Sequence, residues 1–349
     1  MADKVLMSGN EAAGEAAIRA GCRFYYGYPI TPQNELTAYM AEHMPEAGGT
    51  FIQAESELAA INMCYGTSAT GKRCMTSSSS PGISLKQEGI SYCAGAELPV
   101  VVVNVQREGS GLGFIGAAQG DYFQATRGGG HGDYRTIVLA PASVQETADL
   151  VMEGFDLADL WRIPVVLLTD AQIGQLMEPL VFRKSKKRKL PDKRSWALSG
   201  AAGREHHIVK SFFWTSADIR TFNEHLREKH AEICRKEVRF EDIDVDDAEI
   251  VIVAYGTPAR ISTEVVARMR ADGRKVGLIR PITLWPFPND HVREVAERAR
   301  AFLVVEMSLG QMVEDVRLAV EGRCNVHFFG YAGGGAPTAA EIIERLKTL

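Results

Sequence analysis

Cysteine is scarce in this sequence, and its spacing is wide. The 349 residues contain six cysteines, none in a CxxC pair, at positions 22, 64, 74, 93, 234 and 324. Structural zinc sites and iron–sulfur clusters usually use closely spaced cysteines. We therefore expect isolated, buried thiols in a reducing compartment and no metal cluster held by this chain alone.

Long apolar runs and an excess of positive charge are also missing. No apolar run reaches the about 18–20 residues of a membrane-spanning helix, which argues against a membrane protein. The N-terminal residues lack the apolar core and cleavage site of a signal peptide, so we expect a cytoplasmic protein. The formal net charge of -5 argues against general nucleic-acid binding, which needs a basic surface. The eight histidines show no metal-ligand spacing.

The sequence does contain a repeated alternation of strand and helix patterns. The run "LPVVVVNVQ" (98–106) is rich in β-branched residues and is typical of a buried parallel strand. Strands that alternate with helices form parallel sheets covered on both faces, and such sheets bind ligands at the carboxyl ends of their strands. We predict an α/β fold with one parallel-sheet domain over residues 1–180 and a second α/β domain over residues 249–349.

Residues 181–248 differ from both domains. The run at 183–194 is strongly basic, which fits either a solvated linker or a localisation or nucleic-acid patch. The acidic balance of the whole chain favours the linker. Residues 216–244 predict one long polar helix with a thin apolar stripe at Ile219, Phe222, Leu226 and Ile233. We interpret 181–248 as a basic linker followed by a connecting helix.

Two small-residue loops allow a functional and a structural interpretation. The glycine-rich "YAGGGAPTAAE" (331–341) either cradles a phosphate at a helix N-terminus or makes a tight connection, and it lacks the Lys-Ser/Thr of a P-loop. The run "SSSSPG" (77–82) is not a G-x-S-x-G elbow and has no evident His or Asp partner. We expect its hydroxyls to line a polar pocket.

Two further positions follow predicted strands. In "GYPITP" (27–32), prolines on both sides of Thr31 fix the backbone, so its hydroxyl either recognises a carboxylate or carbonyl or belongs to a structural turn. Arg107 ends the most buried strand. Its guanidinium either clamps a carboxylate with two hydrogen bonds or pairs with a structural carboxylate.

The stretch "FIQAESELAAINM" (51–63) places Glu55 and Glu57 where a strand turns into a helix. Carboxylates are favoured at helix N-termini by about 0.3–1 kcal/mol, which applies to both residues alike. The residues alone therefore do not separate a structural from a catalytic glutamate.

A family resemblance does separate them. The segments "GYPITPQNE", "QAESELAAINM", "TSSSSPGISLKQEGISYCAGAELPVVVVNVQR", "QGDYFQATRGGGHGDYR", "RPITLWPFP" and "VVEMSLGQMVEDVR" occur in order along nearly the whole chain. Together they resemble the α-type subunit of 2-oxoacid:ferredoxin oxidoreductases, and most of all the branched-chain (2-oxoisovalerate) members. This resemblance implies a pyrimidine-binding thiamine diphosphate domain followed by a domain like the transketolase C-terminal domain.

The resemblance also implies roles for four residues. Glu55 would be the catalytic glutamate that hydrogen-bonds N1′ of the cofactor pyrimidine, in an apolar site formed with Phe51, Ile52 and Ala54. Ile30 and Glu55 would contact the cofactor. Thr31 and Arg107 would bind the substrate carboxylate. The loop after Arg107 reads "EGSG", where relatives tend to have Gly-Gly-Pro, and no role follows for Glu306 in "EMSLGQ".

The implied reaction converts a 2-oxoacid, coenzyme A and oxidised ferredoxin into acyl-CoA, CO2 and reduced ferredoxin. Thiamine diphosphate and Mg2+ would be shared with, and mainly held by, a β-type partner subunit that also carries a [4Fe–4S] cluster. A small ferredoxin-like subunit could complete the hetero-oligomer. A 2-oxoglutarate-specific enzyme is the second hypothesis, and a non-enzymatic binding protein or scaffold is the third.

Overall fold

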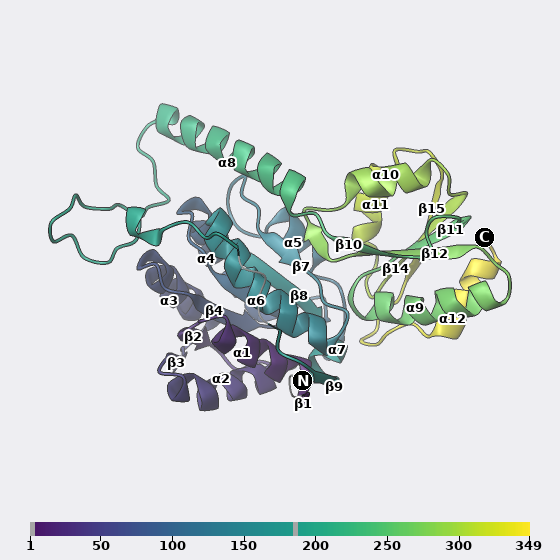
Figure 1. Ribbon diagram of the computed structural model, residues 1–349, viewed down its shortest axis with the longest axis horizontal. Coiled ribbons are helices and arrows are strands. Elements are labelled where there is room, and N and C mark those ends of the chain that lie inside the picture. Colours follow the sequence, from purple (N-terminus) through teal and green to yellow (C-terminus); the bar gives the residue numbers. More distant parts are fainter. Residues whose placement is uncertain (1–3, 184–187) are drawn as a thin grey trace.

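The computed structural model describes residues 4–183 and 188–349, which form two α/β domains built on separate sheets (Figure 1). The larger sheet has eight strands: β2 (Phe24–Gly27), β3 (Thr50–Gln53), β4 (Cys74–Ser78), β5 (Val101–Glu108), β6 (Phe114–Ala117), β7 (Ile137–Leu139), β8 (Val165–Asp170) and β13 (Thr283–Trp285). Their order is β13-β7-β8-β5-β4-β2-β3, with β6 paired to β5. The strands from β7 to β3 along this path are parallel, as the alternating sequence pattern predicts.

Side-chain alternation along the strands explains why this sheet is covered on both faces. Val101, Val103 and Val105 of β5 belong to one apolar cluster, while Val102 belongs to another. The first cluster is covered by α1 (Gly9–Arg19), α2 (Asn34–Glu46) and α6 (Val144–Trp161). The second cluster is covered by α3 (Glu57–Ala69), α4 (Ser80–Gly95) and α5 (Tyr122–Arg127). The short helix α7 (Ala171–Gln175) and the antiparallel pair β1 (Val5–Ser8) and β9 (Met177–Leu180) complete this domain.

The second domain contains a five-stranded sheet in the order β10-β12-β11-β14-β15. These strands are β10 (Phe240–Ile243), β12 (Val276–Pro281), β11 (Ile250–Val253), β14 (Ala301–Glu306) and β15 (Asn325–Gly330). Only β10 is antiparallel to its neighbour. Helices α9 (Gly256–Ala271) and α12 (Ala339–Lys347) pack on one face, and α10 (Asn289–Ala296) and α11 (Met312–Val320) pack on the other.

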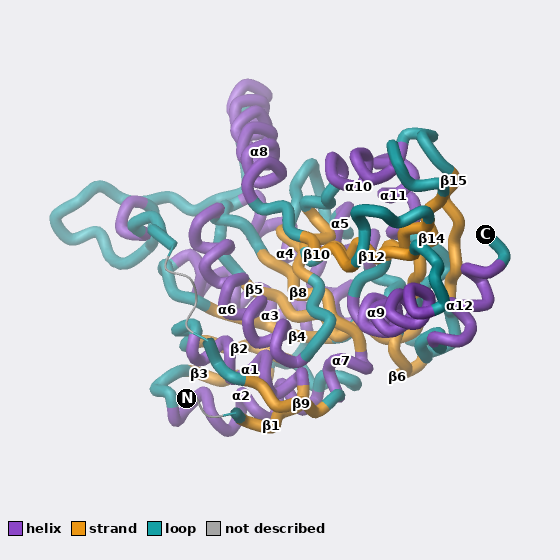
Figure 2. Tube along the Cα trace, turned by 45° about the vertical axis from the view of Figure 1, so that its right-hand side comes forward, coloured by secondary structure: helices purple, strands orange, loops and turns teal. Residues whose placement is uncertain are grey.

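The predicted helix over 216–244 is wrong at its C-terminal end. Helix α8 (Ser216–Lys236) stops eight residues earlier, and residues 240–243 form β10 of the second sheet instead. The reason is tertiary pairing, because the backbone of these residues joins the edge of β12. The predicted stripe is buried at Leu226 and Ile233, whereas Ile219 is 38% exposed. In Figures 1 and 2 the N-terminal end of α8 lies away from both sheets.

The basic run at 183–194 lies partly outside the described residues. Of its described members, Arg183 pairs with Asp149, Arg188 with Glu153 and Glu237, and Lys193 with Asp159. Arg194 pairs with Asp192 inside the run, and 193–195 form a 3-10 turn (η1, Lys193–Ser195). These basic side chains are neutralised by carboxylates of the same chain. The domain boundaries near residues 180 and 249 remain a prediction. Strand β10 joins the second sheet although it precedes residue 249, and strand β13 joins the first sheet although it follows that residue.

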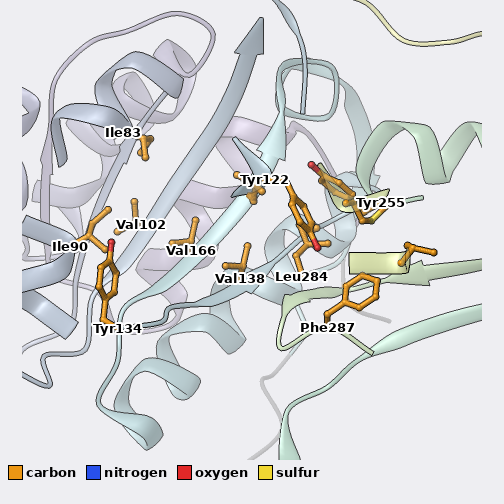
Figure 3. Close-up of a cluster of buried hydrophobic side chains, with 14 of the residues drawn as sticks. Ile83, Ile90, Val102, Tyr122, Tyr134, Val138, Val166, Tyr255, Leu284 and Phe287 are labelled. Carbon is orange, nitrogen blue, oxygen red and sulfur yellow. The ribbon is translucent and has the colours of Figure 1, made fainter. Parts of the chain in front are cut away.

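The two domains share one apolar core (Figure 3). The ring centroids of Tyr122 and Tyr255, which come from different domains, lie 5.9 Å apart, and Val138 and Leu284 belong to the same cluster. Strand β13 extends this contact as an antiparallel neighbour of β7. A buried, continuous core of this kind fixes the second domain against the first.

Polar contacts reinforce this junction. The Gln119 side chain donates to the backbone carbonyl of Tyr255 at 2.9 Å and accepts from the amide of Met307 at 3.0 Å. The Thr257 hydroxyl donates to the buried Asp170 carboxylate at 2.8 Å. Because a buried polar group without a partner is costly, these contacts specify the relative position of the domains.

Lys86 of α4 is a fully buried lysine that contacts α3 and β4. Its ammonium donates to the Glu57 carbonyl at 3.3 Å and to the Thr76 hydroxyl at 3.0 Å. Burial lowers the pKa of Lys86 to about 8, because desolvation disfavours the charged form.

This pKa predicts a pH dependence of stability. Between pH 8 and 10.5 the unfolded chain binds a proton at this site and the folded chain releases it, so the free energy of unfolding should rise with pH. Lys86→Met should remove that contribution. Urea unfolding of both proteins at pH 8 and pH 10 checks this, and equal changes with pH in both would contradict it.

A second prediction concerns the contact between β6 and the 331–335 loop. A Cβ at Gly116 would lie 2.2 Å from the carbonyl oxygen of Gly334, so Gly116→Ala must displace backbone. We expect the free energy of unfolding to fall by about 1–3 kcal/mol. Gly120→Ala is the matched control, because a Cβ there meets nothing within 4 Å. Equal losses in both variants, measured by chemical unfolding, would exclude this contact as the cause.

Candidate functional site

The predicted site residues lie at the carboxyl edge of the larger sheet, where four neighbouring strands end. Thr31 follows β2, Glu55 follows β3, and Arg107 lies near the end of β5. Strand β4, which ends in the serine run, lies between β2 and β5. Parallel strands bring residues far apart in sequence to one edge, which is where ligands bind in such sheets.

Arg107 and Thr31 are in direct contact. The Arg107 guanidinium donates from Nη1 to the Thr31 carbonyl at 2.9 Å and from Nη2 to the Leu112 carbonyl at 2.7 Å. The Arg107 side chain is 8% exposed, and its buried Nε has no hydrogen-bond partner within the described part of the chain. The Thr31 hydroxyl accepts from the Asn34 amide at 3.1 Å. The structure therefore pairs Arg107 with backbone carbonyls at this edge, which neither sequence interpretation included.

Glu55 and Glu57 have different surroundings. Glu55 is exposed, and its carboxylate accepts no hydrogen bond from residues 4–183 or 188–349. The expectation of an apolar, desolvated site is wrong for this chain by itself, because Ile52 is 39% exposed and Phe51 is only half-buried. Glu57 is buried as the first residue of α3, and its Oε1 lies 3.5 Å from the Ser78 hydroxyl. An open carboxylate at Glu55 is free to accept a hydrogen bond from a ligand.

Ile30 is half-buried in the loop that carries Thr31. Its neighbour Tyr28 is 36% exposed, so the β2 exit presents apolar surface on the same edge as Glu55. Such a surface fits the ring of a pyrimidine, whose polar edge Glu55 could bind.

A cavity of about 470 Å³ opens between the two domains next to Arg107. Residues of both domains line it: Ser80, Pro81, Ser84, Arg107, Glu108, Gly109, Ser110, Gly111, Gly120, Asp121, Ser308, Leu309, Gln311, Ala332 and Gly333. Among these described lining residues, Arg107 is the one cation, and Glu108 and Asp121 are the acids. The expectation that the serine run lines a pocket holds for Ser80 and is wrong for Ser77, Ser78 and Ser79, which are fully buried and do not line the cavity.

Asp121 was missed by the sequence reasoning. Its carboxylate accepts from the Ser80 hydroxyl at 2.6 Å and from the Asn104 amide at 2.8 Å. Burial raises the pKa of Asp121, and these two hydrogen bonds partly oppose that effect. The sequence did contain a signal for its partner Asn104. This residue alternates with buried valines on β5 and therefore points to the same face as Val102.

The glycine-rich loop binds a carboxylate of this chain. The amides of Gly333 and Gly334 both donate to Oε2 of Glu108 at 2.9 Å. Both glycines have positive φ angles, of 156° and 76°, which favour glycine there. These two hydrogen bonds join the two domains. This agrees with the interpretation of the loop as a tight connection and not as a phosphate cradle.

Glu306 has a structural role that the sequence did not reveal. It is fully buried, and its carboxylate accepts from the amides of Gln311, Met312 and Val313 at 2.9–3.1 Å and from the Ser308 hydroxyl. Burial raises the pKa of Glu306, and the backbone hydrogen bonds partly oppose this. Glu306 therefore satisfies the free amides at the start of α11 and shapes the loop that lines the cavity.

The cysteines and helices give two further findings. Four cysteines are buried, Cys234 is exposed and Cys324 is half-buried. Within residues 4–183 and 188–349, no group of three or more His, Cys, Asp or Glu side chains could hold a metal ion. The helices of the same residues include none with the length and apolar character to cross a membrane.

Comparison with protein families gives two matches that together span most of the chain. Residues 15–242 match the thiamine diphosphate-binding family of pyruvate flavodoxin/ferredoxin oxidoreductases. Residues 248–342 match core domain II of pyruvate:ferredoxin oxidoreductase. The two matched segments meet close to β10, at the junction between α8 and the second sheet.

Similar proteins extend over the full chain. It is 51% identical to the ketoisovalerate oxidoreductase subunit VorB of Methanothermobacter thermautotrophicus over 342 residues, which are 98% of this chain and 97% of that protein. It is 36% identical to the 2-oxoglutarate synthase subunit KorA of Methanothermobacter marburgensis over 380 residues, with 99% of each chain covered.

Solved structures agree on the fold. The 2-oxoglutarate:ferredoxin oxidoreductase of Magnetococcus marinus, determined with 2-oxoglutarate, coenzyme A and succinyl-CoA bound, is 26% identical with a TM-score of 0.90. The match covers 99% of this chain, which spans 65% of the length of that one. A split-gene transketolase, 14% identical with a TM-score of 0.61 over 98% of this chain and 97% of that one, shares the fold alone.

These findings confirm the predicted α/β fold and the resemblance on which the site residues were chosen. The chain belongs to the 2-oxoacid:ferredoxin oxidoreductases, an oxidoreductase family, and contains that family's thiamine diphosphate-binding domain followed by its core domain II.

Proposed function

We propose that this chain is the α-type subunit of a thiamine diphosphate-dependent enzyme that oxidatively decarboxylates a branched-chain 2-oxoacid such as 2-oxoisovalerate. The products would be an acyl-CoA, CO2 and reduced ferredoxin. The contact of Arg107 with Thr31 beside a cavity between the domains carries this proposal. The 51% identity to a ketoisovalerate oxidoreductase subunit supports the substrate class.

Arg107 and Thr31 would bind the carboxylate of the substrate. The guanidinium is held by two carbonyls, so its charge is fixed at the cavity without a carboxylate partner in the described part of the chain. A fixed cation that is not paired with a carboxylate attracts and orients an anionic group. Thr31 is the residue whose carbonyl Arg107 binds, and its hydroxyl would donate to the same carboxylate.

Glu55 and Ile30 would hold the pyrimidine side of the cofactor. When bound, thiamine diphosphate supplies the electron sink for decarboxylation, and the protein supplies orientation and proton control. The Glu55 carboxylate would hold the proton shared with pyrimidine N1′. Because Glu55 is exposed in this chain, a partner subunit would have to shield it from water.

The partner would therefore complete the site. We propose a β-type subunit that holds the diphosphate, Mg2+ and a [4Fe–4S] cluster, with a small ferredoxin-like subunit and ferredoxin as further partners. The names of the relatives as oxidoreductase subunits support a hetero-oligomer. We place this assembly in the cytoplasm.

The charges of the cavity favour a neutral substrate side chain. A second substrate carboxylate, as in 2-oxoglutarate, would need another cation, and the described lining residues add the acids Glu108 and Asp121 instead. Leu309 and Ala332 supply apolar surface for a branched aliphatic group. This observation favours 2-oxoisovalerate over the 2-oxoglutarate hypothesis.

Replacing Glu55 by Gln should lower kcat of the assembled enzyme by about 100-fold or more, because the amide keeps the side-chain size but cannot hold the proton. Steady-state reduction of ferredoxin or a dye acceptor measures this. Glu42→Gln, an exposed carboxylate on α2, is the control and should leave kcat unchanged. Near-normal turnover by the Glu55 variant would sink the catalytic assignment.

The substrate assignment predicts a ratio of rates. With the same holoenzyme, kcat/KM should be at least about tenfold higher for 2-oxoisovalerate than for 2-oxoglutarate, because a buried, unpaired second carboxylate costs more than about 1.4 kcal/mol. A ratio that favours 2-oxoglutarate would replace this assignment with the second hypothesis.

A further inference from the structure

The serine run at the end of β4 connects the two segments that carry Thr31 and Arg107. β4 lies between β2 and β5, so its exit is next to both of theirs. Ser77 is fully buried and Ser80 is 8% exposed. Buried hydroxyls need hydrogen-bond partners, and these two find theirs in the segments on either side.

Ser77 acts on the β2 side. Its hydroxyl donates to Oε1 of the fully buried Gln33 at 2.6 Å. Gln33 in turn donates from its side chain to the Tyr28 carbonyl at 3.3 Å and from its backbone amide to the Ile30 carbonyl at 3.1 Å. These bonds span the loop on which Thr31 lies, so Ser77 anchors that loop to the central strand.

Ser80 acts on the β5 side. Its hydroxyl accepts from the Arg107 amide at 3.0 Å and donates to Asp121 Oδ2 at 2.6 Å. Asn104, three residues before Arg107 on β5, donates to the same carboxylate oxygen at 2.8 Å. The backbone of Arg107 is thus held on the serine run, while its guanidinium reaches across to the Thr31 carbonyl.

We propose that Ser77 and Ser80 are positioning residues for the substrate carboxylate. Through the hydrogen bonds of their hydroxyl groups, they would set the separation between Thr31 and Arg107. They would not bind the substrate themselves. This inference rests on the proposed function, because it assigns those two residues to the carboxylate of a 2-oxoacid. Displacements of about 1 Å in such groups are enough to change binding and rate strongly.

Ser79 provides a matched control within the same run. It is fully buried like Ser77, but its hydroxyl has no hydrogen-bond partner within the described part of the chain. It does not line the cavity. Ser79→Ala therefore removes the same atom from the same serine run without breaking a side-chain hydrogen bond to either segment.

The experiment compares Ser77→Ala, Ser80→Ala, Ser79→Ala and the conservative Ser80→Thr in the complete holoenzyme. KM is measured for 2-oxoisovalerate and for coenzyme A, with the thermal midpoint of each variant. We expect Ser77→Ala and Ser80→Ala to raise KM for the 2-oxoacid about tenfold, the effect of losing about 1.4 kcal/mol of binding. KM for coenzyme A should stay constant, Ser79→Ala should match wild type, and Ser80→Thr should restore most of the loss.

The double variant Ser77→Ala/Ser80→Ala tests whether the serines act through one site. Its KM should rise by less than the product of the single effects, because both act through the same Arg107–Thr31 pair. If Ser80→Ala does not assemble, the comparison of Ser77→Ala with Ser79→Ala still decides the outcome.

Two results would overturn the inference. One is a 2-oxoacid KM in Ser77→Ala and Ser80→Ala equal to that of Ser79→Ala, and the other is a lower thermal midpoint with both KM values unmoved, the mark of a purely structural role. Failure of the proposed function looks different, because the wild-type holoenzyme would then reduce no acceptor with 2-oxoisovalerate.

Discussion

The packing of the second domain against the carboxyl edge of the larger sheet is the constraint on which the site depends. Tyr122 and Tyr255 meet in one apolar core, and Gln119 and Asp170 fix the junction through buried hydrogen bonds. The cavity exists because this contact leaves room between the β5 exit and the loop at 308–311. Shared burial therefore links the stability of the fold to the shape of the site.

Much of the architecture was predictable, because parallel strands and their covering helices leave local patterns. The valines of β5 and the glycine-ended helices are read from a few neighbouring residues. The predictions from sequence failed where pairing with a strand distant in the sequence decides the local structure. Residues 240–243 form a strand only because β12 is beside them, and β13 joins the first sheet although it follows strands of the second. Sequence periodicity carries no information about such partners.

For the candidate site, the location of the chosen residues was predictable, but their contacts were only partly so. The resemblance selected Thr31, Glu55 and Arg107, which do lie at one edge of one sheet. The hydrogen bond from Arg107 to a carbonyl, and those accepted by the carboxylates of Asp121 and Glu306, depend on loops that meet only after folding. The environment of Glu55 was expected from apolar neighbours, yet those neighbours leave it open in this chain.

Glu108 has a consequence for the electrostatics of the cavity. By binding the amides of Gly333 and Gly334, it neutralises partial positive charges that would otherwise attract anions to the far wall. Among the described residues that line the cavity, Arg107 is then the one cationic side chain that an anionic ligand can meet. The chain's own carboxylate thereby makes the two walls of the cavity electrostatically different.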